Sequence, residues 1–168
     1  YTDYDADGTE KAMPEISFAK EKLTKKYGSA DYKYEVTTNS TGKVVYRSSN
    51  TSVAEPDQFG YITIKKAGSC TITAMVAADA NYKSASAGYQ LVVSKKDMTK
   101  KKVKLSKTSY IYAGKNCKPK AVVSGLARSD YKVTYKNADK PGTAICVITG
   151  KGNYSGKIEV PYSINLAK

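Results

Sequence analysis

From Lys43 onward, apolar and polar residues alternate in short runs, and Gly, Asn, Asp or Ser residues interrupt these runs. A period of two places one face of a β-strand against a core and the other toward solvent. Turn residues about every 8–12 positions are typical of sandwiches and barrels. The spacing of an amphipathic helix is sustained nowhere. The pattern therefore predicts an all-β protein.

The first half of the chain is expected to form seven strands, the number typical of an immunoglobulin-type sandwich. They are Glu15–Ala19, Tyr32–Thr37, Val44–Ser48, Ser52–Ala54, Tyr61–Lys65, Cys70–Ala77 and Gly88–Val93. The second half is expected to form six strands, which fit a truncated sandwich. These are Val103–Ser106, Tyr110–Ala113, Lys118–Val123, Tyr131–Tyr135, Thr143–Thr149 and Lys157–Ile164.

A charged run with almost no apolar residue, from Ser94 to Lys102, separates the two halves. Few contacts are expected to cross such a segment, which is typical of a domain boundary. The sequence thus predicts two immunoglobulin-like β-sandwich domains in tandem, at residues 14–96 and 97–168. Residues 1–13 are expected to form an N-terminal arm or linker.

The composition argues against an enzyme. The chain has 15 Tyr but no His and no Trp. Histidine is the commonest general base and a frequent metal ligand, so its absence disfavours triad-type hydrolysis and most zinc chemistry. No catalytic residue and no cofactor is predicted. No apolar run is long enough for a membrane helix, so membrane insertion is not expected.

The net charge of +13 is concentrated in the second half. Residues 1–97 hold 13 Lys/Arg and 12 Asp/Glu, whereas residues 98–168 hold 15 and 3. Such a bias attracts anionic wall polymer, acidic glycan or nucleic acid through a field that salt weakens. The alternative is that the lysines only keep the surface hydrated.

Three stretches of the first half carry a family resemblance: Val45–Ala54 (VYRSSNTSVA), Gly60–Ile64 (GYITI) and Ala67–Ala74 (AGSCTITA). Together they closely resemble the bacterial Ig-like group 2 domain, over residues 14–94. This resemblance implies an immunoglobulin-like fold and export from the cell.

The second half, residues 101–168, resembles a further Ig-like module found in surface proteins of gut Firmicutes. The resemblance lies in Leu105–Tyr110, Lys118-Pro119, Asp130–Asn137 and Gly150–Gly156. The two resemblances imply a spacer, adhesion segment or accessory module of a larger exported protein. They imply no catalytic residue and no fixed ligand site.

Cys70, Cys117 and Cys146 stand where the alternation points inward. They are interpreted either as three small buried apolar groups or as one inter-sheet disulfide with one thiol left over. Exported proteins meet an oxidising compartment, and Cys117 on an early strand could face Cys146 on a late one. A Cys117–Cys146 bridge is therefore a hypothesis, with Cys70 free.

Asp3, Asp5 and Asp7, followed by Gly8, copy the first half of a calcium-binding loop. The second half is missing, because Pro14 occupies the position of the bidentate acid and Glu15 comes one residue late. A solvated acidic arm is the alternative interpretation.

Four functions remain open on the sequence. The leading hypothesis is a non-catalytic spacer or adhesion module, extracellular or attached to the cell surface. We expect it to be a monomer whose partners are other domains of the same protein, host or wall glycans, or other surface proteins. The alternative is an accessory module that binds carbohydrate or anionic wall polymer. Nucleic-acid binding lacks a recognised motif, and a hydrolase lacks a workable constellation.

Overall fold

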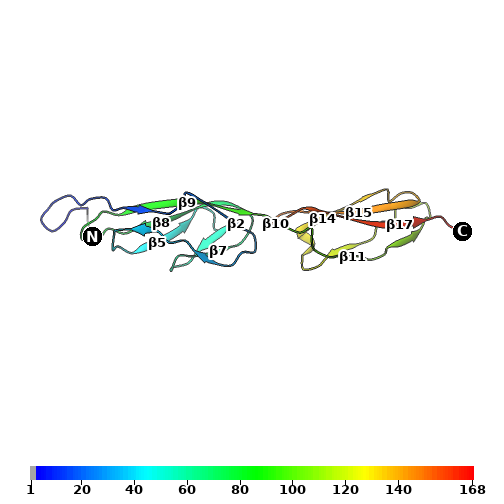
Figure 1. Ribbon diagram of the computed structural model, residues 1–168, viewed down its shortest axis with the longest axis horizontal. Coiled ribbons are helices and arrows are strands. Elements are labelled where there is room, and N and C mark those ends of the chain that lie inside the picture. Colours follow the sequence, from blue (N-terminus) through cyan, green and yellow to red (C-terminus); the bar gives the residue numbers. More distant parts are fainter. Residues whose placement is uncertain (1–2) are drawn as a thin grey trace. The chain divides into compact units, whose positions relative to one another are not determined.

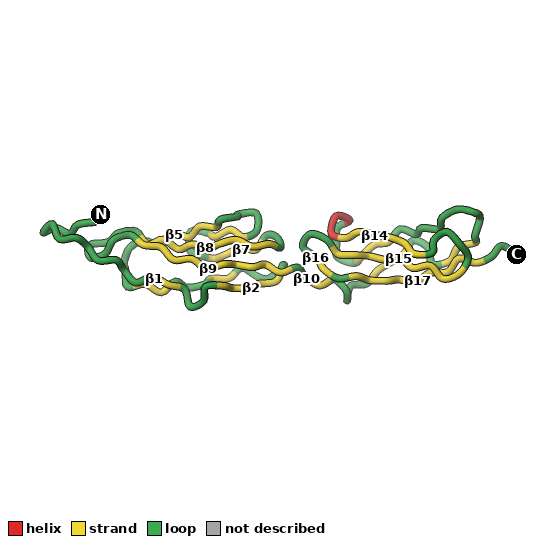
Figure 2. The backbone as a smooth tube through the Cα atoms, turned by 90° about the horizontal axis from the view of Figure 1, so that it is seen from above, coloured by secondary structure: helices red, strands yellow, loops and turns green. Residues whose placement is uncertain are grey.

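The computed structural model describes residues 3–168 and divides the chain into two compact units, with the division between Ser94 and Lys95 (Figure 1). Strands and loops make up nearly all of the described chain. The exception is one 3₁₀ turn at Arg128–Asp130, which is red in Figure 2. No helix of the described residues is long and apolar enough to cross a membrane.

One layer of the first unit is a four-stranded sheet, ordered β2 (Lys22–Lys26), β9 (Ala85–Ser94), β8 (Gly68–Val76) and β5 (Val44–Ser48). Strand β2 runs parallel to β9, and the other pairs are antiparallel. In β8 the side chains from Cys70 to Val76 alternate between buried and less buried positions, as the sequence pattern predicted.

The facing layer of the first unit is a three-stranded sheet, ordered β3 (Tyr32–Lys33), β7 (Tyr61–Ile64) and β6 (Ala54–Pro56). A short antiparallel pair, β1 (Ile16–Ser17) with β4 (Thr37–Thr38), lies beside the main sheets. Between the layers lies a buried cluster of Val53, Ala54, Ile62, Cys70, Ile72, Tyr89, Leu91 and Val93.

The second unit repeats this plan with fewer strands. Its four-stranded sheet is ordered β12 (Ser109–Ile111), β17 (Lys157–Asn165), β15 (Gly142–Gly150) and β14 (Tyr131–Lys136), and β12 runs parallel to β17. The facing layer has only β11 (Val103–Leu105) and β13 (Ala121–Val123). A parallel pair, β10 (Lys96–Asp97) with β16 (Tyr154–Ser155), begins the unit.

The first unit therefore has two facing antiparallel sheets that enclose a core, with an early strand added in parallel to the last strand. This arrangement is an immunoglobulin-like β-sandwich. The predicted fold class, all-β and immunoglobulin-like, is confirmed. The bounds predicted for two separate domains remain a prediction.

Strand β2 is absent from the sequence prediction. Its sequence, KLTKK, places lysines at three of five positions and half-buries only Leu23 and Lys25. The strand forms because β9 offers it a backbone edge: Lys22 to Lys26 pair with Gln90 to Ser94. The strands β10 and β16 were missed for another reason, since each has only two residues and shows no periodicity of its own.

Candidate functional site

Asp79, in the loop between β8 and β9, is the most densely hydrogen-bonded carboxylate of the described chain. One carboxylate oxygen accepts hydrogen bonds from the Thr41 amide (2.9 Å), the Thr41 hydroxyl (3.0 Å) and the Ser40 hydroxyl (3.2 Å). The other accepts from the amides of Asn81 (2.8 Å) and Tyr82 (2.7 Å). The carboxylate therefore ties two loops at one end of the sandwich together.

These donors stabilise the ionised form of Asp79. The Thr41 amide and then the Asn81 amide hold the pKa of this buried carboxyl well below its ordinary range. The backbone oxygen of Asp79 also accepts a hydrogen bond from Nζ of the buried Lys11 at 2.7 Å. All of these partners are protein groups within the first unit, so the arrangement is structural.

The expected N-terminal arm contacts this same end of the first unit. Ala12 forms a parallel bridge with Tyr82, and Lys83 forms an ion pair with Glu10. Asp5 accepts hydrogen bonds from the amides of Asp7 and Thr9, at 3.2 and 2.9 Å. The carboxylates here complete turns of the backbone.

The calcium-loop hypothesis gains no support from this geometry. Asp7 also accepts a hydrogen bond from the Thr9 amide, at 2.9 Å. Within residues 3–168, no group of three or more acidic or cysteine side chains converges as a metal site would require. Asp3, Asp5 and Asp7 are therefore not brought together as ligands.

All three cysteines are buried free thiols. The hypothetical Cys117–Cys146 bridge is not formed in this structure, although both residues belong to the same core cluster of the second unit. Cys70 lies in the core of the first unit. Burial raises the pKa of the Cys146 thiol, which disfavours the reactive thiolate. The bridge remains a prediction for the oxidised protein.

Three tyrosines of the second unit donate their hydroxyls to one backbone segment. Tyr162 donates to the carbonyl of Cys117 at 2.6 Å, Tyr135 donates to Pro119, and Tyr131 donates to Ala121 at 3.4 Å. The three acceptors are every second residue of this segment. Successive carbonyls of an extended chain point in opposite directions, so every second carbonyl points to the same side.

These bonds join the four-stranded sheet to the segment that leads into β13. Tyr131 is buried, and Tyr110, Tyr112 and Tyr135 pack against the same core. These rings pack against the core of the unit, so they do not form an exposed sugar-stacking surface.

In the second unit the rings of Tyr110 and Tyr162 also meet, at a centroid distance of 5.9 Å, but more such ring contacts occur among the described residues of the first unit. The ring of Tyr89 lies edge-on to Phe18 and Tyr34, at centroid distances of 4.8 and 5.1 Å. Its hydroxyl is 2.8 Å from the hydroxyl of Tyr32. Both units therefore use tyrosine to fill the core, but they satisfy its hydroxyl differently.

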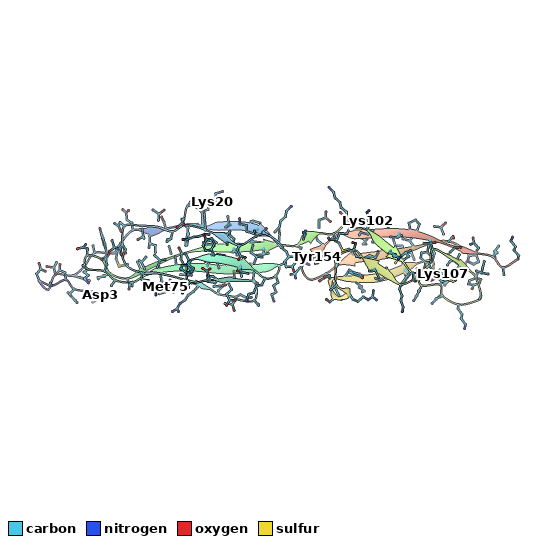
Figure 3. All side chains as sticks on the ribbon, turned by 90° about the horizontal axis from the view of Figure 1, so that it is seen from below. Asp3, Lys20, Met75, Lys102, Lys107 and Tyr154 are labelled. Atoms are coloured by element: carbon cyan, nitrogen blue, oxygen red, sulfur yellow. The ribbon has the colours of Figure 1, made fainter. Side chains whose placement is uncertain are left out.

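A shallow groove of mixed polarity lies on the first unit, where Met13, Ile16 and Met75 line it together with Glu15 and Ser84. Val45, the register partner of Met75, lines an adjoining hollow that Met75 shares. Met13 and Met75 are 62% and 40% exposed. Met75 is labelled in Figure 3. The groove contains no nucleophile with a base beside it.

Charge divides sharply between the units. Residues 1–94 hold 11 Lys/Arg and 11 Asp/Glu, and residues 95–168 hold 17 and 4. The first unit is therefore neutral, and the second carries the whole excess of +13. The difference in net charge between the two parts is larger across the boundary after Ser94 than across the boundary predicted after residue 96. The reason is that Lys95 and Lys96 belong to the second unit.

Residues 24–79 match the family model described as the immunoglobulin-like domain of intimin. Together with the sandwich topology, this match supports a bacterial immunoglobulin-like domain in the first unit. The group 2 and Firmicutes module types remain finer proposals. No curated protein sequence matches the chain.

Several solved structures are similar to the chain. Human protocadherin-24 EC1-2 has 10% identity and a TM-score of 0.41, with 94% of this chain and 99% of that chain covered. An I-band fragment from titin has 14% identity and a TM-score of 0.43, with 92% and 66% covered. A SusE-like surface located polysaccharide binding protein from Bacteroides thetaiotaomicron has 14% identity and a TM-score of 0.32, with 95% and 35% covered. Similarity at this level carries no argument about function.

Proposed function

We propose that this chain is a non-catalytic structural and adhesion segment of a larger exported bacterial protein. The observation that carries the proposal is the match of residues 24–79 to the intimin immunoglobulin-like domain. The first unit supports it, because Asp79 ties two of its loops together and no buried side-chain nitrogen or oxygen of the described residues lacks a hydrogen-bond partner. In this role the chain spaces or presents other domains, and its chemistry is limited to packing and hydrogen bonding.

Surface labelling tests this proposal. Antibodies raised against the chain are expected to label intact cells of the source organism, and brief protease treatment of those cells should remove the signal. A cytosolic protein is the matched control and should be labelled only after lysis. If the chain behaves like the cytosolic control, the extracellular role is wrong.

A second candidate function is an accessory module that binds an anionic glycan or wall polymer. The observation that favours it is the charge division, because a domain-sized unit with 17 cationic and 4 acidic side chains attracts polyanions. The full chain should then bind soluble polyanions saturably at low salt. A chain that binds none of them under those conditions would leave only the structural role.

A further inference from the structure

The outer face of the small β11–β13 sheet carries four lysines. Along β11, Lys104 is exposed between the more buried Val103 and Leu105, and Lys102 shares its side of the strand. Along the segment leading into β13, Lys118 and Lys120 are exposed and alternate with the buried Cys117, Pro119 and Ala121. We call Lys102, Lys104, Lys118 and Lys120 the lysine face; Lys102 is labelled in Figure 3.

Strand register keeps these charges apart from one another. Lys104 lies opposite Val122, whose side chain is 59% exposed. The Ser124 amide bonds to the Lys102 carbonyl at 2.9 Å, and the Ser106 amide bonds to the Lys120 carbonyl at 2.8 Å. Each of these three lysines therefore faces a neutral residue. Like charges directly opposite would be destabilising, so the arrangement tolerates four cations on these two strands and the residues that flank them.

The lysine face has no acidic partner among the described residues. Of the four acids in the second unit, Glu159 pairs with Lys136 on the other sheet, and Asp130 accepts a hydrogen bond from the Ala127 amide. Asp97 accepts one from the Thr99 amide at 2.8 Å. Asp139 lines a hollow that Lys118 also lines, but they form no ion pair. The positive charge of the face is thus not neutralised within the unit.

The side chains around the lysines limit the classes of ligand that the lysine face can bind. Alternate residues on one strand are about 6.6–6.8 Å apart, so the cations form a row of regularly spaced point charges. The exposed large apolar residues of the second unit are Ile111, Val122 and Leu166, none of which is aromatic. The aromatic ring beside the face is that of Tyr135, whose centroid is 5.8 Å from Lys118 Nζ. This ring packs against the core, and its hydroxyl donates to the Pro119 carbonyl, so the face offers no fully exposed ring on which a sugar or a nucleobase could stack.

We propose that the lysine face binds a flexible phosphodiester polymer of the polyol-phosphate type. Such a chain carries one negative charge per short repeat and needs no stacking surface. Lysine ammonium groups bind phosphate oxygens as point charges, without the planar fork that arginine gives to carboxylates. The methyl groups of Val122 lie within the row and can contact the carbon backbone of the polyol. This inference rests on the second proposed role and assigns it a surface and a ligand class.

The test compares two variants of the full chain with equal formal charge. The first replaces the lysine face: K102Q, K104Q, K118Q and K120Q together. The matched control replaces four other exposed lysines of the same unit, K132Q, K140Q, K151Q and K157Q. The probe is synthetic poly(glycerol phosphate), and binding is measured by calorimetry over a series of salt concentrations. Circular dichroism establishes that both variants are folded.

The face variant is expected to bind at least about tenfold more weakly than the unmodified chain, and its log–log salt slope should be smaller by roughly 2–3. The control variant should lose less than about threefold, because its lysines contribute only to the distant field. Equal losses in the two variants would overturn the assigned face while leaving general polyanion binding in place. No binding by the unmodified chain would overturn both proposals.

A measurement on the unmodified chain tests the lysine face without depending on whether the variants fold. Nuclear magnetic resonance titration with poly(glycerol phosphate) is expected to shift the amide signals of Val122, Ser106 and Ser124 most strongly. Shifts centred on β14 or β17 instead would contradict the assignment. Heparin, polygalacturonate and oligothymidylate serve as comparison polymers at about 0.15 M salt. Tighter binding of heparin or polygalacturonate than of poly(glycerol phosphate), at equal charge, would overturn the phosphodiester class. Tighter binding of oligothymidylate, which is also a phosphodiester, would overturn the polyol-phosphate type.

Discussion

The two units share the same four-strand order and the same parallel pairing of an early strand with the last one, yet they close their sandwiches differently. The first unit has a facing sheet of three strands, and Tyr89 fills the space among aromatic rings. The second has a facing sheet of two strands, and tyrosine hydroxyls replace missing contacts by donating to backbone carbonyls.

This difference teaches how a smaller sandwich can remain ordered. A facing layer with fewer strands leaves more backbone groups without a strand partner. Tyrosine serves this need, because its ring packs in the core while its hydroxyl donates to a backbone carbonyl. The second unit therefore depends more on hydrogen bonds between layers, and the first depends more on ring packing.

The largest expected effect comes from removing the central ring of the first unit. Tyr89 is 2% exposed and contacts two other aromatic rings. We expect Tyr89→Ala to lower the free energy of unfolding of the first unit by about 3–5 kcal/mol, since it leaves a large cavity. Hydrogen exchange resolved by peptide should show lost protection in β8 and β9, with β15 and β17 unchanged. Equal loss in both units would show that they unfold together.

The second-largest effect is expected when a tyrosine of the second unit loses its hydroxyl but keeps its ring. Tyr162→Phe keeps the ring but leaves the buried Cys117 carbonyl without its donor at 2.6 Å. We expect a loss of about 1–2 kcal/mol in the second unit, measured by denaturant unfolding. Tyr89→Phe is the matched control, and it should cost less because the half-buried Tyr32 hydroxyl can bond to water. If the control costs as much, the proposed contrast between the units is wrong.

Acid should distinguish the units through Asp79. Its folded pKa lies below its ordinary value, so its contribution to stability is complete above the unfolded pKa and is lost as the pH falls toward the folded value. Below about pH 4, the first unit should therefore lose stability with a slope that Asp79→Asn reduces. Thermal unfolding followed at several pH values measures this slope. An unchanged slope in the variant would assign the acid sensitivity to other carboxyls.

The smallest expected effect is a difference in thiol reactivity. Buried cysteines should react slowly with iodoacetamide in the native protein, and the raised pKa of Cys146 slows it further. Mass spectrometry after unfolding without reductant counts the thiols. Three labelled cysteines match the structure, and one labelled cysteine, Cys70, would establish the Cys117–Cys146 bridge. The bridge would give the second unit a covalent stabilisation of about 3 kcal/mol.

Much of the fold could be predicted from local pattern. Each strand predicted from alternation overlaps a strand of the structure, because a buried face repeats every second residue and the sequence records it directly. Strand β2 could not be predicted in this way, since its lysines obscure the alternation. Its pairing with β9 depends on an edge formed by residues more than sixty positions later in the chain.

The candidate sites, like strand β2, could be predicted only in part from local sequence. Asp79 was not recognised from the sequence, although its place just before Asn81 and Tyr82 in a predicted turn was a usable signal, since Asp in a turn accepts amides two and three residues later. The three aspartates near the start were recognised as a motif, but the carboxylates of Asp5 and Asp7 accept hydrogen bonds from nearby amides, and the three do not form a ligand group.

The fold class and the concentration of charge in the second half follow from the amino-acid sequence alone, because alternation and composition are local properties of the chain. The three-dimensional arrangement is needed to know which lysines share a face, which tyrosine hydroxyl meets which carbonyl, and which acids are already engaged. These facts depend on register between strands distant in sequence. A shift of one residue in that register would exchange the buried and exposed faces of a strand, and with them the lysine face itself.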